Sequence, residues 1–408
     1  MSKNEKKYMV PKLRFQEFQG EETWVRGRIG DYLKESRIKG SKGDTAKKIT
    51  VKLWGNGVFE KQETLRGSEN TQYFRRKAGQ FIYSKLDFLN QAFGIIPSHL
   101  DHYESTADLP CFDVSKKLDT RFLLEYVQRK DFYKKYGEIA DGGRIAKRIQ
   151  VETFLNFPIY LPKLTEQQKI ADCLSSLDEL IGAEARKLEA YKIHKKGLMQ
   201  KLFPAEGKTV PEWRFPEFRD AGEWEENTLG GVATFFNGRA YNKGEFLEVG
   251  KYKVLRVGNL FSNGEWYYSN LELEENKYCE DGDLLFAWSA SFGPRIWRGE
   301  KVIYHYHIWK VVEHEGVYKQ FLFMLLDYET ERMKMKSSNG LGMLHITKGT
   351  IESWKCYLPK FAEQQKIADC LSSLDELITA QSQKVEALKT HKKALVQGLF
   401  PFVGEEGV

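Results

Sequence analysis

Two long stretches of the chain place apolar side chains at alternate steps of four and three residues, which puts them in one narrow seam along a helix. The seam positions are Ile170, Leu174, Leu177, Ile181, Leu188, Leu198 and Leu202 in the first stretch, and Ile367, Leu371, Leu374, Ile378, Val385, Leu388, Leu395 and Leu399 in the second. We expect two helices of about 38 residues, roughly 57 Å long at ~1.5 Å per residue. Pro204 and Pro401 should end them.

The two seam stretches are copies in an internal repeat. Residues 166–181 read EQQKIADCLSSLDELI, and residues 363–378 repeat these sixteen letters 197 positions later. Both copies follow Leu-Pro-Lys and close on Leu-Phe-Pro. A weaker match relates residues 10–18 to residues 210–218. Each half of the chain therefore consists of one variable block followed by one nearly constant block.

A helix of this length needs a partner along its whole seam. The most economical partner is the other copy, because two helices with the same seam can bury it against each other. The alternative, in which each helix only covers its own domain, stays open at this point. Thr165 and Gln168 fit a capping box at the first helix start, whereas Ala362 replaces the threonine in the second copy.

The variable blocks both combine strand and helix patterns. In the first block we expect strands at 49–53 and 81–83 and a helix at 120–136; in the second, strands at 252–257, 283–287 and 302–312 and a helix at 317–336. A glycine-bearing turn follows each helix, at 141–143 and 339–342. The predicted class is α+β, with two mixed α/β domains of one fold in an internal repeat, separated by two long helices.

The composition, 408 residues with 41% hydrophobic and 29% charged side chains, is typical of a globular protein. The longest apolar run, 321–326, is far shorter than the ~20 residues that cross a bilayer. The charged N-terminus lacks the apolar region of a secretory signal. Five cysteines without a CxxC pair predict reduced thiols in a cytoplasmic protein.

The net charge of +6 averages two unlike blocks. Residues 1–160 hold 30 basic and 21 acidic residues, a net of +9, whereas residues 211–357 hold 18 and 22, a net of −4. The basic clusters contain Lys47, Lys48, Lys52, Arg144, Lys147 and Arg148 in the first block and Arg295, Arg298 and Lys348 in the second. Such clusters suit contacts with phosphates. For any single member, a solvated surface side chain is the commoner interpretation.

No motif for catalysis is found. The chain has neither a GxxxxGK[ST] phosphate loop nor an HExxH metal helix. His305 and His307 flank Tyr306 in an expected strand and would share a face, but two histidines without a third ligand are more often structural than metal-binding. We therefore expect no catalytic and no metal-binding residue in this chain.

The doubled EQQKIADCLSSLDELI after Leu-Pro-Lys, behind two dissimilar blocks, resembles the specificity (S) subunit of type I restriction-modification systems. Residues 78–85 and 281–287 also resemble the strand that enters the middle of the family's target recognition domains. The resemblance covers essentially the whole chain. It implies a non-catalytic subunit in which each target recognition domain reads one half of a bipartite, asymmetric site in double-stranded DNA. The two long helices would pack antiparallel and set the gap between the halves.

The resemblance also implies partners. Two methylation (M) subunits, which bind S-adenosylmethionine and methylate adenine, would assemble on this chain, and restriction (R) subunits that use ATP and Mg would join the full complex. The chain itself would bind no cofactor. The implied domains are a first target recognition domain at 1–160, a central helix at 161–204, a second target recognition domain at 205–357, and a distal helix with the C-terminal tail at 358–408.

Candidate DNA-binding residues follow from loop position and side-chain chemistry. For reading bases we expect Ser84, Lys85 and Asn90 in the first domain, and Ser289, Ser291 and Arg295 in the second. Arg144, Lys147 and Arg148 would hold the DNA backbone, with His345 and Lys348 in the equivalent segment of the second domain. Two other classes stay open: an adaptor whose helices and domains bind only proteins, and a freestanding enzyme of another kind.

Overall fold

The computed structural model describes residues 10–62, 68–138, 148–262, 264–289, 291–337 and 346–402. The chain divides into two compact units, each assembled from separated segments. The first unit contains residues 1–185 and 383–408, and the second contains residues 186–382. Both long helices therefore contribute one part to each unit.

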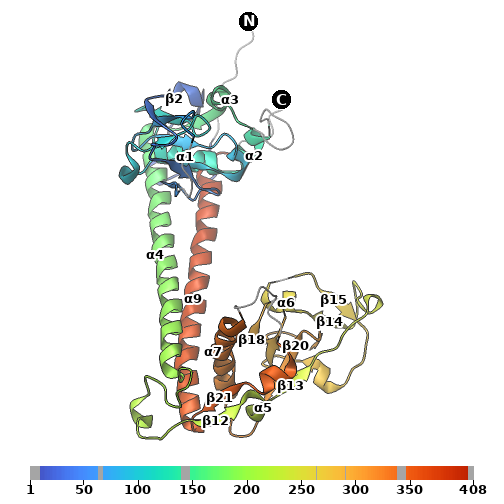
Figure 1. The fold of residues 1–408 in the computed structure, drawn as a ribbon. Coiled ribbons are helices and arrows are strands. Elements are labelled where there is room, and N and C mark those ends of the chain that lie inside the picture. Colours follow the sequence, from blue (N-terminus) through green and yellow to red (C-terminus); the bar gives the residue numbers. More distant parts are fainter. Residues whose placement is uncertain are drawn as a thin grey trace. The chain divides into compact units, whose positions relative to one another are not determined.

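The two long helices are α4, Leu164–Leu202, and α9, Phe361–Leu399, of 39 residues each (Figure 1). Their predicted length is confirmed. The predicted capping box is wrong, because α4 begins one residue before Thr165. Instead, the N–H groups of Glu166 and Gln167 donate to the carbonyl of Lys163. The second copy starts in the same way on Lys360, so replacing the threonine with Ala362 changes nothing at this helix end.

Within each unit the helix segments run antiparallel. In the first unit Glu184 pairs with Lys384 and Asp178 pairs with Lys392, so one sequence number rises as the other falls. The seam residues at the helix ends are buried in the domain cores: Ile170, Leu174 and Leu399 in the first unit and Leu202, Ile367 and Leu371 in the second. The other seam side chains are buried or half-buried. Each core is thus closed by the start of one helix and the end of the other.

Two lysines interrupt the apolar seam at equivalent steps of the repeat, Lys195 in α4 and Lys392 in α9, and both form ion pairs. In the first unit the Lys392 ammonium lies 2.7 Å from Asp178 on α4 and 2.9 Å from Glu125 on α1 (Thr120–Gln128). In the second unit Lys195 lies 2.6 Å from Asp375. Lys195 and Lys392 are equivalent in the repeat, as are Asp178 and Asp375. The same interhelical ion pair therefore occurs once in each unit.

A carboxylate from each domain accompanies this ion pair. Burial raises the pKa of Glu125, and the nearby Lys392 ammonium opposes that shift. In the second unit burial raises the pKa of Asp327 on α7 (Lys319–Ser337), and Lys195 opposes the shift. Burial disfavours the charge of Lys392, but Glu125 and Asp178 outweigh it and raise its pKa. Lys392 thus joins α4 to the first domain by direct contacts, and Lys195, which pairs with α9, lies near enough to Asp327 of the second domain to affect its pKa.

The first unit contains two main sheets and three short helices. Its four-stranded antiparallel sheet has the order β2 (Leu33–Ser36), β10 (Cys111–Val114), β7 (Phe81–Tyr83), β8 (Phe93–Ile95). A second sheet has the order β3 (Lys39–Lys42), β6 (Gln72–Arg75), β9 (Glu104–Ser105); β4 (Ile49–Val51) pairs with β5 (Val58–Glu60), and β1 (Val25–Arg28) with β11 (Pro158–Leu161). The helices are α1 (Thr120–Gln128), α2 (Lys130–Gly137) and α3 (Val151–Asn156), and the 3₁₀ turns are η1 (Gln16–Phe18), η2 (Ile29–Asp31), η3 (Phe88–Asn90) and η4 (Ser98–Leu100).

The second unit repeats the first sheet with other residues. Its order is β13 (Ala233–Asn237), β20 (Ile308–Glu313), β17 (Leu284–Ala287), β18 (Gly293–Ile296). A second sheet has the order β15 (Tyr267–Ser269), β14 (Tyr252–Leu255), β19 (Val302–Tyr304), β16 (Tyr278–Cys279), and β12 (Glu225–Thr228) pairs with β21 (Lys355–Leu358). The helices are α5 (Leu229–Val232), α6 (Val257–Phe261), α7 (Lys319–Ser337) and α8 (Lys348–Glu352), with η5 (Pro216–Phe218), η6 (Lys243–Glu245) and η7 (Glu275–Lys277). The predicted α+β class with two domains of one fold is confirmed.

Four expected elements differ from the structure. The strand expected at 252–257 stops at Leu255, because Val257 begins α6. The helix expected at 120–136 is two helices, because Arg129 between them is extended, with φ −67° and ψ 139°. The strand expected at 302–312 is two strands separated by the turn His305–His307. The strand expected at 49–53 stops at Val51. The glycine turns expected at 141–143 and 339–342 lie outside the described residues.

An arginine joins the start of each domain to the start of a long helix. Arg14 donates from Nε and Nη2 to the two carboxylate oxygens of Glu166, at 2.8 and 2.7 Å. Arg214 holds Glu363 in the same way, at 2.7 Å for both bonds. All four side chains are at least half-buried, and their bidentate, charge-assisted hydrogen bonds are stronger than hydrogen bonds between neutral groups.

Replacing Lys392 with methionine should destabilise the protein by about 2 kcal/mol, because it leaves the largely buried Glu125 carboxylate without its cation. Chemical denaturation of the purified chain measures this loss. Lys389→Met is the matched control on the same helix: its exposed ammonium pairs with Glu386, three residues away. A surface pair of this kind contributes under about 0.5 kcal/mol. Equal losses in the two variants would contradict the role given to Lys392.

Candidate nucleic-acid interface

The backbone around the central strands β7 and β17 has the same conformation and the same hydrogen bonds in both units. We call this shared arrangement the backbone frame. Gly79 and Gly282 precede these strands with φ of 81° and 88°, a conformation that favours glycine. Their N–H groups donate to the carbonyls of Ile96 and Trp297, at 2.8 and 2.9 Å. Counting along these strands makes position 85 of the first unit equivalent to position 288 of the second.

Just after each central strand, the backbone bonds to the segment that leads into the neighbouring strand. The N–H of Lys85 donates to the carbonyl of Asp108 at 3.0 Å, and the N–H of Trp288 donates to the carbonyl of His307 at 3.2 Å. The register of β7 with β10 and of β17 with β20 makes Asp108 equivalent to His307. The same pair of backbone positions is therefore occupied by lysine and aspartate in the first domain, and by tryptophan and histidine in the second. We call these two places the first and the second strand tip.

The first strand tip brings together some of the expected DNA-binding residues. Lys85 is half-buried, and the Arg148 guanidinium lies 3.7 Å from the Asp108 carboxylate. Ser84 is buried, and its hydroxyl exchanges hydrogen bonds with Asp87 at 3.1 Å. The Asn90 amide reaches the same carboxylate at 3.4 Å. Ser84 and Asn90 are thus engaged in a local turn, whereas Lys85 and Arg148 lie beside Asp108.

The lysines expected to contact phosphates differ in exposure. Lys47 and Lys52 are exposed, but Lys48 is only 5% exposed and its ammonium lies 5.4 Å from the ring centre of Tyr73. The Lys47 carbonyl accepts from the N–H of Glu104 in β9, which precedes the first strand tip. Arg144 and Lys147 lie outside the described residues, so their expected role stays a prediction.

In the second unit several expected residues are engaged by neighbours. Arg298 pairs with Asp281 at 3.2 Å, and Lys348 pairs with Glu352 at 3.5 Å. Arg295 on β18 is exposed, and its guanidinium lies 4.3 Å from the ring centre of Phe261. Ser289 is half-buried and Ser291 is exposed, while His345 lies outside the described residues. The structure therefore leaves Arg295 and Ser291 more accessible than Ser289, and base reading by these residues stays a prediction.

The turn His305–His307 was not predicted from the sequence, which indicated one continuous strand at 302–312. The rings of Tyr306 and His307 lie 3.9 Å apart, and those of His305 and Tyr306 lie 4.5 Å apart. Trp288 packs against His307 with ring centres 5.0 Å apart. Residues 305–307 contain none of the residues that favour turns, and tyrosine is enriched in strands, so no local signal predicted this turn.

Burial shifts the ionisation of several groups in the units. It lowers the pKa of His305 to about 4, assisted by His307 and Arg256, so this ring is neutral at neutral pH. Burial also raises the pKa of Cys111 and of Cys356 to about 12, which keeps both thiols protonated. All five cysteines are free thiols.

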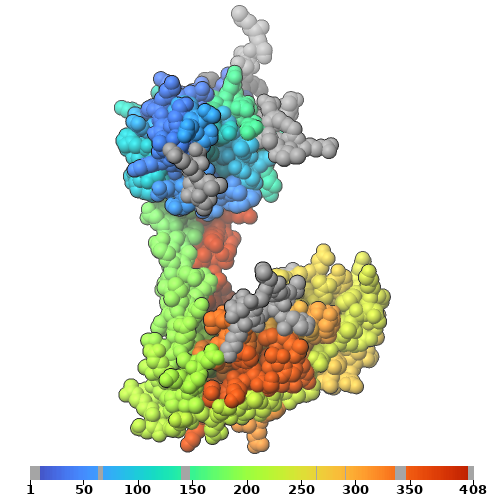
Figure 2. Space-filling view, in the orientation of Figure 1, coloured from blue at the N-terminus to red at the C-terminus, as the bar shows by residue number. Residues whose placement is uncertain are grey.

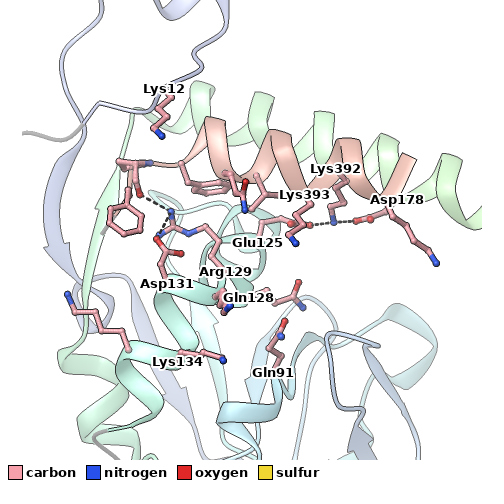
Figure 3. Close-up of a pocket in the computed structure, with 18 of the residues that line it drawn as sticks. Lys12, Gln91, Glu125, Gln128, Arg129, Asp131, Lys134, Asp178, Lys392 and Lys393 are labelled. Atoms are coloured by element: carbon pink, nitrogen blue, oxygen red, sulfur yellow. Dashed lines mark hydrogen bonds and ion pairs between the residues drawn. The ribbon is translucent and has the colours of Figure 1, made fainter. Parts of the chain in front are cut away.

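A hollow of about 1230 Å³ lies in the first unit between α2 and the last turns of α9 (Figure 3). Lys12, Lys134 and Lys393 line it together with the ion pair of Lys392 and Asp178. The side chain of Arg129 on its wall donates from Nη1 to the carbonyl of Pro401 at 2.9 Å. This arginine thereby fastens the Leu-Phe-Pro segment of the second repeat to the first domain. Among the described residues, no group of three or more His, Cys, Asp or Glu side chains could hold a metal ion.

None of the described helices is both long and apolar enough to span a bilayer. A relative from Methanocaldococcus jannaschii, the type I restriction enzyme MjaVIII specificity subunit, is 28% identical over 407 residues, covering 92% of this chain and 91% of its own. The solved structure of a type I restriction-modification system S subunit from M. genitalium has a TM-score of 0.59 at 16% identity and covers 97% of this chain and 100% of its own. A chain from a structural study of complex assembly and conformational transition of the type I R-M system has a TM-score of 0.58 at 14% identity, covering 93% and 97%.

The family model for the type I restriction modification DNA specificity domain matches the chain twice, at residues 21–191 and 221–390. Each match contains one variable block and most of the long helix that follows it. Together the two matches span well over half of the sequence, and the chain belongs to the family of type I restriction-modification DNA specificity proteins.

Proposed function

We propose that this chain is the DNA-recognition subunit of a type I restriction-modification complex and that each of its two domains reads one half of a bipartite, asymmetric site. The observation that carries this proposal is the pair of equivalent sheets with different strand tips. A single backbone frame that presents lysine and aspartate in one domain and tryptophan and histidine in the other is suited to reading two different sequences.

The helix pair supports a fixed spacing between the half-sites. A repeated ion pair, Lys392 with Asp178 and Lys195 with Asp375, specifies the register of the helices in each unit. Polar pairs within an apolar seam are a known way to fix register. A helix pair in a single register holds its ends at a constant separation. The unspecified gap of the DNA site would follow from that length.

We further propose that methylation subunits dock on the helices. Leu180 on α4 and Leu377 on α9 are equivalent in the repeat and are 43% and 49% exposed. In the space-filling view side chains of α4, in green, lie at the surface (Figure 2). Two equivalent exposed leucines suit two copies of one partner. S-adenosylmethionine would be bound by those methylation subunits, and ATP with Mg by restriction subunits, so that this chain supplies recognition and no chemistry.

Exchanging residues 1–160 for the corresponding block of another family member should change one half-site of the methylated sequence and leave the other half-site and the gap intact. Single-molecule sequencing of methyl-adenine, in cells that carry this chain with its methylation subunits, reads both half-sites and the gap together. Methylation that ignores the sequence would argue for a protein-binding adaptor. Turnover by the purified chain alone with S-adenosylmethionine would argue for a freestanding enzyme.

Inserting seven residues into both helices, after Ala185 and after Ser382, should lengthen the gap by about three base pairs, since seven residues add ~10 Å and a base pair ~3.4 Å. Seven residues keep the phase of the seam and leave both ion pairs in register. The control inserts the same seven residues into α4 alone, which puts the helices out of register and should abolish methylation. An unchanged gap with the double insertion would refute the spacing role.

Rising salt should weaken binding through the first domain more than through the second, because residues 1–160 carry a net +9 and residues 211–357 a net −4. Each neutralised phosphate adds about −0.9 to the slope of log affinity against log salt. The test compares duplexes with one intact half-site and one scrambled half-site, bound to the complex with methylation subunits. Equal slopes would show that the charge difference does not reach the DNA.

A further inference from the structure

The second strand tip is a preorganised structure, held by contacts from two strands. The Trp288 N–H and its indole Nε1 donate to the carbonyls of His307 and Tyr306, at 3.2 and 2.8 Å. The Trp288 ring also packs on Trp309, with ring centres 5.7 Å apart and planes at 22°. Tyr306 at the centre of the turn is 38% exposed nonetheless. The fold thus fixes the backbone of this turn while directing an aromatic side chain outward.

The surroundings of the tip are polar and cationic. Arg256 lies close enough to His305 to disfavour its protonated form. Arg239 pairs with Glu245 at 2.7 Å, and its main chain bonds the turn on both sides, donating to Tyr304 and accepting from Tyr306. A neutral imidazole, a phenol and a nearby guanidinium provide both hydrogen-bond donors and acceptors. These are the group types that contact base edges and phosphates.

The equivalent place in the first domain has different chemistry on the same frame. Asp108 there takes the position of His307, and Ala107 takes the position of Tyr306. The Asp108 carboxylate is 51% exposed beside Arg148. Two domains with one strand order therefore differ in hydrogen-bonding character at the strand tip.

We propose that the turn His305–His307 enters the major groove of the second half-site and that Tyr306 contacts a base edge there. The inference rests on the proposed function and specifies the residue through which the second domain reads DNA. The turn joins β19 of one sheet to β20 of the other, and a major groove that admits an α-helix has room for a three-residue turn with one exposed ring. The Tyr306 hydroxyl would bond a base edge, with Trp288 holding the turn from behind. Asp108 would take the corresponding place at the first half-site and accept a hydrogen bond from an exocyclic amino group.

The test uses the chain assembled with its methylation subunits and reads the methylated sequence by single-molecule sequencing. Tyr306→Phe removes only the hydroxyl, and Tyr306→Ala removes the whole ring. We expect a loss of roughly tenfold in preference at one base pair of the second half-site with phenylalanine, and a larger loss with alanine. The first half-site and the gap should not change. Asp108→Asn should produce the converse, a change in the first half-site alone.

Tyr268→Ala is the matched control, a half-buried tyrosine on strand β15 of the same unit. It should leave both half-sites as they are, and thermal unfolding of each variant shows that the fold is kept. Unchanged preference in both Tyr306 variants would overturn the inference while leaving the proposed function intact. A wild-type complex without any bipartite site would overturn both. A uniform loss of methylation in Tyr306→Phe, with unaltered base preference, would assign the tyrosine to the DNA backbone and also overturn the inference.

Discussion

The seam lysine, placed between a carboxylate of the other helix and a carboxylate of a domain, is the interaction on which the rest of the structure depends. An apolar seam alone permits slippage by one heptad, since every shifted register still buries leucine against leucine. A lysine whose side chain is only 19% exposed opposes such a shift, because leaving its carboxylate partners would leave a largely desolvated charge unpaired. Lys392 forms ion pairs with both Asp178 and Glu125. One side chain therefore fixes the register of the helices and the position of the first domain on them.

The attachments that the repeated segments make to each domain allow the two domains to have different sequences. The constant blocks carry the elements that hold each domain in place: Glu166 and Glu363 bind Arg14 and Arg214, and the Leu-Phe-Pro segments enter the cores. Phe400, for example, packs between Trp24 and Phe122 of the first domain. Because these attachments come from the repeat, the sheets need to share only their strand order and backbone frame. The tips are then available to differ.

Much of the architecture could be predicted from the sequence because it is encoded by local periodicity. The seam of four and three gave the length of both helices, and the identical sixteen residues revealed the repeat. The strand tips could not be predicted in the same way, since Lys85 and Asp108 or Trp288 and His307 meet only through strand pairing over long sequence distances. The break at Arg129 had the same origin: its guanidinium is bound by Pro401, a residue 272 positions away. Local helix propensity carries no information about such a partner.

Ion pairs within the second unit reinforce the charge difference between the two domains. In the second unit many lysines are already engaged by acids: Lys253 with Glu300, Lys301 with Glu275, and Lys310 with Asp283. Cations engaged in this way contribute less to a field that attracts phosphates. Under the proposed function, a domain with a net negative block and paired lysines would gain little from the DNA backbone, so its contribution to binding would depend on fitted contacts with base edges. The aromatic tip suits that requirement. The first domain has an excess of positive charge and a tip that is itself an ion pair. It would therefore supply most of the affinity, while the second domain would depend more heavily on complementarity.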